Sequence, residues 1–140
     1  MSVRRKSREL AVQMLFQWEM RHESPARIEA GFWKHTSASD MTRKFANQLF
    51  EGAVGHRDSI ELLLEKHSQG WQLDRIPAID RAILRLAVWE IRGTGTPPNV
   101  AITQALEVAR IYSAEDSLAY INAVLDAIEK EQQAASAKRA

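Results

Sequence analysis

The sequence of 140 residues carries 19 lysines and arginines against 18 aspartates and glutamates, a net charge of +1, and 45% of its residues are hydrophobic. This length and composition predict one globular domain with a core of its own, and no uncharged stretch is long enough to span a bilayer. Cysteine is absent, which excludes disulfides, thiolate metal sites and a cysteine nucleophile; because an apolar signal core is also lacking, we expect a cytoplasmic protein without contact to membranes.

The first predicted helix covers residues 3–21 and begins with a basic cluster. Its inward face has apolar residues at helical spacing, namely Leu10, Ala11, Met14, Leu15 and Trp18. Four cations precede the first acidic residue, Glu9. They are Arg4, Arg5, Lys6 and Arg8. Cations oppose the positive end of a helix dipole, so this cluster does not serve to stabilise the helix that carries it.

Two further helices are expected in the first half of the chain. Ser24 followed by Pro25 predicts a helix start, with an end near residue 34 or 35. Ser39 or Asp40 caps a longer helix that runs to about residue 67. Gly52 and Gly55 weaken this helix locally and allow either a close helix contact or a kink.

A helix at residues 78–92 is apolar around nearly its whole circumference, so other helices must surround it. Asp80 and Glu90 lie inside its apolar arc. Each therefore needs a buried partner, a capping role or a gap in the packing where another molecule docks. For Asp80 the simplest alternative is an acid in the first turn, where the helix dipole favours it.

The chain ends with two more predicted helices. The breaker at residues 93–98 precedes a helix from about residue 100 to 112, capped by Asn99, and a last helix ends near residue 130. Residues 134–140 have little to bury and are expected to form a disordered tail. Since no segment alternates with period two, the sequence predicts an all-α domain of about seven helices over residues 1–133.

The sequence contains only fragments of known catalytic motifs. His56-Arg57-Asp58 lacks the other parts of a kinase catalytic loop, and the pair Glu19 and His22 lacks the second such pair of a di-iron site. Walker, dinucleotide-binding and G-x-S-x-G patterns are missing as well. We therefore expect a binding protein that is not an enzyme and needs no metal or cofactor.

Two features favour RNA as the ligand. The basic cluster suits phosphate contacts, although a solvated, frayed terminus is the alternative. In the last helix Asp116 and Tyr120 are four residues apart and share one face. A ring beside a carboxylate can stack on an unpaired base and accept a hydrogen bond from its edge, whereas the alternative places Tyr120 in the core.

Three separated blocks resemble the NusB family of transcription antitermination factors. They are Arg4-Arg-Lys-Ser-Arg-Glu-Leu-Ala-Val-Gln-Met-Leu-Phe-Gln-Trp18, Leu73-Asp-Arg-Ile-Pro77 with Asp80-Arg-Ala-Ile-Leu-Arg-Leu-Ala-Val-Trp-Glu-Ile91, and Val100 to Asp126. The resemblance implies a NusB-like fold of two roughly perpendicular helical bundles. It also implies binding to single-stranded boxA RNA of ribosomal RNA leader transcripts, jointly with the ribosomal protein NusE, in an RNA polymerase antitermination complex.

The resemblance carries family contacts onto particular residues. The RNA contacts are Arg4, Arg5, Lys6, Arg8, Asp116, Ser117 and Tyr120, and the contact to the protein partner NusE is Asp80. Tyr120 stands where a Phe is common in the family, and Leu118-Ala119 replaces a basic or polar pair, so contacts at the last helix are expected to be weaker. Members occur as monomers and as homodimers that hide the basic face, which leaves a homodimer open.

Three other functions compete with this one. A helical module that binds only protein would use its basic terminus for solubility. A NusB-like RNA-binding domain of an rRNA methyltransferase would be followed by a catalytic domain. An enzyme of unrecognised type would need a pair of titratable groups at reacting geometry. A salt titration of RNA binding distinguishes the first of these from an RNA-binding factor.

Overall fold

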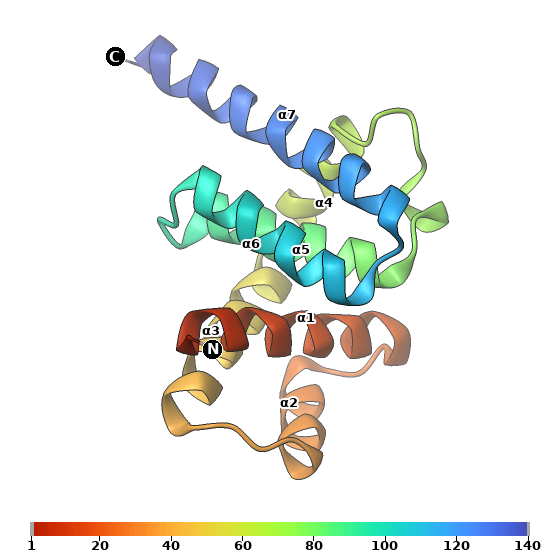
Figure 1. Cartoon of the computed structure of the whole chain (residues 1–140), viewed down its shortest axis with the longest axis vertical. Coiled ribbons are helices and arrows are strands. Elements are labelled where there is room, and N and C mark those ends of the chain that lie inside the picture. The colour runs from red at the N-terminus through yellow and green to blue at the C-terminus, as the bar shows by residue number, and fades with distance from the viewer. Residues whose placement is uncertain (1, 140) are drawn as a thin grey trace.

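A computed structural model describes residues 2–139, and over this range the chain is all-helical (Figure 1). Its elements in order are α1 (Val3–Arg21), α2 (Pro25–His35), α3 (Asp40–Gly55), α4 (Arg57–Lys66), the short 3-10 turn η1 (Leu73–Arg75), α5 (Ala78–Gly93), α6 (Pro98–Tyr112) and α7 (Glu115–Arg139). The predicted all-α class with about seven helices is confirmed. Within the described residues no helix combines the length and apolar character needed to cross a membrane.

Helix α5 lies at the centre of the molecule, as its apolar circumference predicts. It packs against five other helices, α1, α3, α4, α6 and α7. Figure 1 shows α1, α2 and α3 in the lower part of the molecule and α7 at the top, with α5 in the middle behind α6. The predicted NusB-like arrangement of two helical bundles is confirmed, and α5 is the element that joins them.

Side-chain caps explain where the first three helices begin. Ser2 accepts a hydrogen bond from the backbone N–H of Arg5 at 3.1 Å, and Ser24 and Ser39 cap α2 and α3 in the same way. The inward face predicted for α1 is confirmed, because Leu10, Ala11, Met14 and Leu15 are buried. Helix α6 starts at Pro98, ahead of the expected cap Asn99.

The prediction of one helix over residues 40–67 is wrong, because the chain breaks at His56 into α3 and α4. The imidazole of His56 stacks on the Trp89 ring, with ring centroids 4.2 Å apart. A Cβ atom on Gly52 would lie 2.3 Å from the same indole. Gly52 therefore provides the close helix contact that was one of its two expected roles, and the kink follows one turn later.

Helix α7 is longer than predicted. It continues past the expected end near residue 130 to Arg139, so residues 134–139, expected as a disordered tail, extend the helix here. Ala, Lys and Arg predominate in this stretch, and these residues have high helix propensity. Residues 134–138 are all exposed, so packing does not hold these residues in the helix, and disorder in solution stays a prediction.

Candidate nucleic-acid interface

The basic cluster at the start of α1 divides into exposed and buried members. Arg4 and Arg5 are exposed and Lys6 is half-buried, whereas Arg8 is only 9% exposed. The Arg4 guanidinium lies over the Phe45 ring of α3, 3.9 Å from its centroid. An exposed cation held over an aromatic face keeps its charge available to a ligand.

Arg8 is paired inside the molecule. Its Nε–H donates to both carboxylate oxygens of Glu90, at 2.9 and 3.0 Å. Burial raises the pKa of Glu90, and the Arg8 guanidinium opposes this rise. Arg8 is thus the buried partner that the sequence required for Glu90, and this pairing leaves little of the side chain for RNA.

Arg5 takes part in a three-residue ion cluster with α6. Its Nη2 lies 3.2 Å from Oε2 of Glu107, and Arg110 donates to the other oxygen of the same carboxylate. The side chains of Arg5 and Arg110 are 45% and 55% exposed. Two guanidinium groups from different helices therefore converge on one anion at the surface.

The predicted residues of α7 line a pocket of about 350 Å³. Asp116, Ser117 and Tyr120 form one wall, and the connector between α4 and α5 forms the other with Trp71, Arg75, Ile76 and Pro77. The Tyr120 hydroxyl donates to the carbonyl of Ser68 at 3.0 Å. Burial raises the pKa of Tyr120, with a contribution from the charge of Asp80. The ring is thus half-buried and fixed at the pocket wall.

Trp71 and Arg75 line this pocket and were not among the residues predicted from the sequence. Trp71 is 60% exposed, although indole is usually covered, and Arg75 is exposed beside it. The signal was available in the sequence, since a tryptophan in a connector after Gly70 has no apolar partners at helical spacing. The pocket offers two aromatic rings, a guanidinium and a carboxylate, which is the set of groups that stacks on a base and binds its edge.

Asp80, predicted as a contact to a protein partner, lies inside the molecule. It is 2% exposed, and Ser113, between α6 and α7, donates its hydroxyl to the carboxylate at 2.6 Å. Of the three roles that the sequence left open, the structure supplies a hydrogen-bonding partner. Direct contact with another protein stays a prediction.

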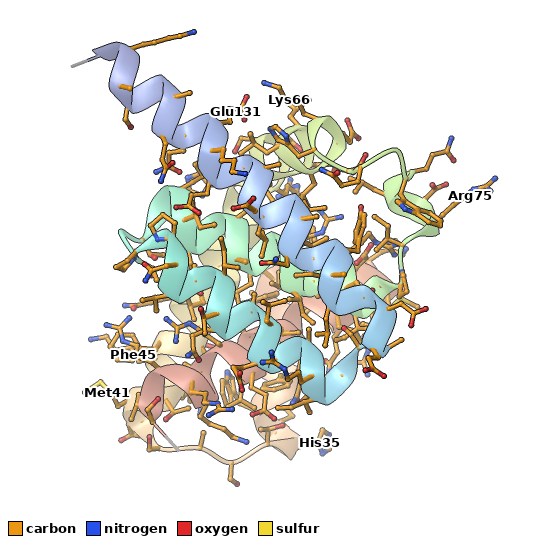
Figure 2. All side chains as sticks on the ribbon, turned by 45° about the horizontal axis from the view of Figure 1, so that its top comes forward. His35, Met41, Phe45, Lys66, Arg75 and Glu131 are labelled. Atoms are coloured by element: carbon orange, nitrogen blue, oxygen red, sulfur yellow. The ribbon has the colours of Figure 1, made fainter. Side chains whose placement is uncertain are left out.

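The two predicted RNA-binding regions are not adjacent. Phe45, which supports Arg4, and Arg75 of the α7 pocket lie at opposite sides of Figure 2, with α6 and the first turns of α7 in front between them. A ligand that touches both must cross this surface. Arg110 is exposed near the C-terminal end of α6, the helix that lies in front between the two regions in Figure 2.

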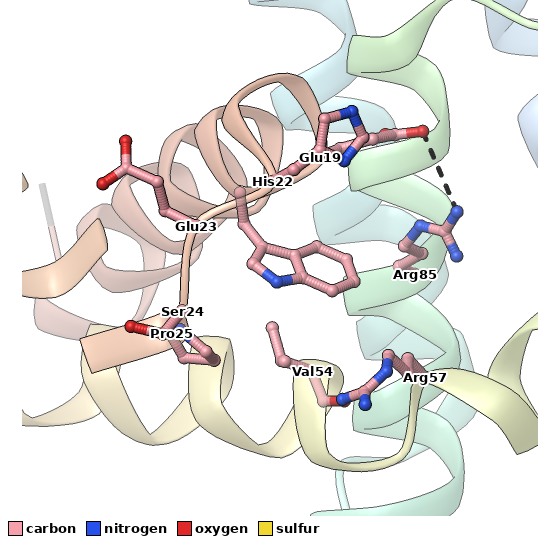
Figure 3. Close-up of a pocket in the computed structure, with 9 residues that line it drawn as sticks. Glu19, His22, Glu23, Ser24, Pro25, Val54, Arg57 and Arg85 are labelled. Atoms are coloured by element: carbon pink, nitrogen blue, oxygen red, sulfur yellow. Dashed lines mark hydrogen bonds and ion pairs between the residues drawn. The ribbon is translucent and has the colours of Figure 1, made fainter. Parts of the chain in front are cut away.

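A second cavity, of about 520 Å³, lies where α1 ends and α2 begins (Figure 3). Glu19 faces it and pairs with Arg81, and Nη2 of Arg85 lies 3.9 Å away. His22 and Arg57 are further lining residues. Within residues 2–139 no three His, Asp or Glu side chains are placed to hold a metal ion, and the cations around Glu19 make it an ion-pair centre.

Comparison with known proteins agrees with the resemblance in the sequence. The pattern of the NusB family matches residues 5–130. The transcription antitermination protein NusB of Koribacter versatilis is 42% identical over 138 residues, covering 97% of this chain and 94% of the relative. T. maritima NusB has a similar structure, with a TM-score of 0.81, 30% identity and 91% of each chain covered. A complex of NusB and NusE with double-stranded RNA has a TM-score of 0.82 and 28% identity, covering 94% of this chain and 98% of that one.

Proposed function

The chain belongs to the NusB family, and from this membership we propose that it is an RNA-binding antitermination factor. Its ligand is the boxA element of ribosomal RNA leader transcripts, bound together with the ribosomal protein NusE. The assembly keeps RNA polymerase transcribing rRNA operons past terminators. The similar solved complex contains NusE and RNA, which supports this choice of partners.

The observation that carries the proposal is the pocket between Trp71 and Tyr120. Both rings lie on its wall, and Asp116 and Arg75 supply an acceptor and a donor. One unpaired base enters this pocket, stacks on an aromatic ring and is held at its edge by the polar groups. Stacking of this kind contributes about 1–3 kcal/mol per base.

The exposed cations at the start of α1 bind the RNA backbone. Arg4 and Arg5 contact phosphates directly, and Lys6 adds a third positive charge next to them. Arg8 acts as a positioning residue, because its ion pair with Glu90 fixes the first turns of α1 on α5. The basic cluster therefore contributes affinity without sequence preference, whereas the pocket contributes selectivity.

NusE docks near the junction of α5, α6 and α7. Asp80 acts there through Ser113, whose hydroxyl it holds at 2.6 Å, and so fixes the turn that leads into α7. Since Asp116 lies in the first turn of α7, directly after that connection, NusE and RNA reinforce each other's binding, and the coupling is reciprocal.

The test is a binding titration with three RNAs of equal length at several salt concentrations. A single-stranded boxA RNA, its scrambled sequence and its duplex are compared, with and without NusE. We expect the boxA strand to bind most tightly, NusE to raise its affinity, and log affinity to fall linearly with log salt. Equal affinity for the boxA and scrambled strands, or no binding of either, would exclude the proposed function.

A further inference from the structure

Glu107 holds two arginines that come from different helices. Arg5 of α1 approaches Oε2, with its Nη2 at 3.2 Å, and Arg110 of α6 donates to Oε1. The Glu107 side chain is 34% exposed, so the carboxylate is within reach of solvent. Each carboxylate oxygen is thus bound by a different guanidinium, at the edge of the basic cluster.

Two guanidinium groups in this arrangement suit a phosphodiester. Two guanidinium groups that converge on one anion can each donate to a non-bridging phosphate oxygen, and such charge-assisted hydrogen bonds are short and strong. A carboxylate has the same charge as a phosphodiester and a similar spacing between its two oxygens. Glu107 therefore occupies the place of the anion and keeps both arginines in position for it.

We propose that Arg5 and Arg110 form a phosphodiester-binding site that Glu107 fills in the free protein, and that an RNA phosphate displaces the Glu107 carboxylate on binding. The site rests on the proposed RNA-binding function and adds Arg110 and Glu107 to it. Its place on α6 also gives the RNA backbone a contact between the basic cluster and the pocket at Tyr120.

Displacement of Glu107 is energetically easy. Exposed ion pairs contribute little to stability because water screens them and two long side chains must be held in one geometry. When the two guanidinium groups bind an RNA phosphate, counterions are released from the RNA, and this release adds to the affinity at low salt. Glu107 thus acts as a weak competitor that prearranges the two arginines.

The experiment removes the competitor and then one arginine. E107Q keeps the size of the side chain and loses its charge, and we expect about a two- to tenfold rise in affinity for the single-stranded boxA RNA at low salt, with a steeper salt dependence. D126N is the matched control, since Asp126 pairs with Lys130 on the exposed surface of α7 at 3.0 Å. It changes the net charge by the same amount, and its affinity should rise less than twofold.

R110A tests the second arginine. We expect weaker binding and a log-log salt slope reduced by about 0.7, the value for one lost phosphate contact on single-stranded RNA. K130A removes one exposed cation elsewhere and should leave the slope unchanged. In the double variant E107Q/R110A the gain of E107Q should disappear. Thermal melting followed by circular dichroism checks that all variants remain folded, as expected for exposed positions.

Several outcomes would overturn the inference. E107Q that behaves like D126N, or R110A that behaves like K130A, would show that the cluster is only a surface ion pair. E107Q that weakens binding would make Glu107 a positioning residue and not a competitor. In each of these cases the unaltered protein still prefers the boxA strand, so the proposed function stands; loss of that preference in the unaltered protein would instead exclude the proposed function itself.

Discussion

The Nε–H of Arg8 in α1 donates to both carboxylate oxygens of Glu90 in α5, at 2.9 and 3.0 Å, and both side chains are nearly covered. We expect R8A to lower the free energy of unfolding by about 3–5 kcal/mol at neutral pH, because a buried carboxylate is left without its partner. Chemical denaturation measures this loss.

The loss in R8A should depend on pH. Burial raises the pKa of Glu90 in the folded protein, and without Arg8 that pKa rises further. When folding raises the pKa of a carboxyl, the resulting stabilisation is complete below the pKa of the unfolded chain. It is lost as the pH rises through the pKa of the folded protein. R8A should therefore be closest to the unaltered protein near pH 4, and a loss that stays constant from pH 4 to 8 would contradict the role given to Glu90.

Gly52 is required by the Trp89 ring. A Cβ atom at this position would lie 2.3 Å from the indole, so G52A overpacks the contact between α3 and α5 and should cost about 1–3 kcal/mol of stability. G31A is the matched control, because a Cβ on Gly31 of α2 meets nothing within 4 Å. Alanine should stabilise that helix by up to about 1 kcal/mol, and equal melting temperatures of the two variants would refute the prediction.

Glu29 should hold a proton at neutral pH. Burial raises its pKa to about 8, helped by a hydrogen bond and charge repulsion from Glu51. Its contribution to stability is complete below pH 4.5 and is lost as the pH rises through 8. E29Q should therefore flatten the decline of stability between pH 5 and 9, and carbon NMR of the Glu29 carboxyl should show its titration near pH 8. A titration near pH 4.5 would disprove this assignment.

Glu131 of α7 forms an ion pair with Lys66 of α4, and the two labelled side chains lie next to each other in Figure 2. Hydrogen bonds from Lys66 and His67 lower its pKa to about 2. The stabilisation from a lowered pKa is present above pH 4.5 and is lost as the pH falls through 2. At pH 6 the melting temperature of E131Q should be lower than that of the unaltered protein. Near pH 2 the two melting temperatures should be equal. The gap at pH 6 is expected to be small because the pair is exposed to solvent.

Trp71 should contribute to RNA binding and little to folding. Its ring is 60% exposed, so W71A removes a stacking surface without opening a cavity, and binding of the boxA strand should weaken by about 1–3 kcal/mol. L62A is the control, since Leu62 on α4 is 68% exposed and lies outside the pocket. Unchanged RNA affinity in W71A, with a melting temperature equal to that of L62A, would remove Trp71 from the interface.

The local pattern of the chain determined the helices and much of their packing. Apolar spacing, serine caps and Pro-Gly breakers act over a few residues, and so they predicted α1 and α2 and the central place of α5. The same reasoning did not place the break at His56, whose imidazole stacks on the Trp89 ring of another helix. Local signals also stopped too early in α7, whose extension has helix-forming residues without an apolar face.

What each charged residue does was decided only by the tertiary structure. The sequence required a partner for Glu90 but did not identify Arg8, because the two residues are 82 positions apart and meet only when α1 packs on α5. It also grouped Arg5 and Arg8 as equals, whereas the fold leaves the first at the surface beside Glu107 and buries the second. Periodicity gives the face of a helix, and only the packing of helices decides whether that face meets a core, a counter-ion or a ligand.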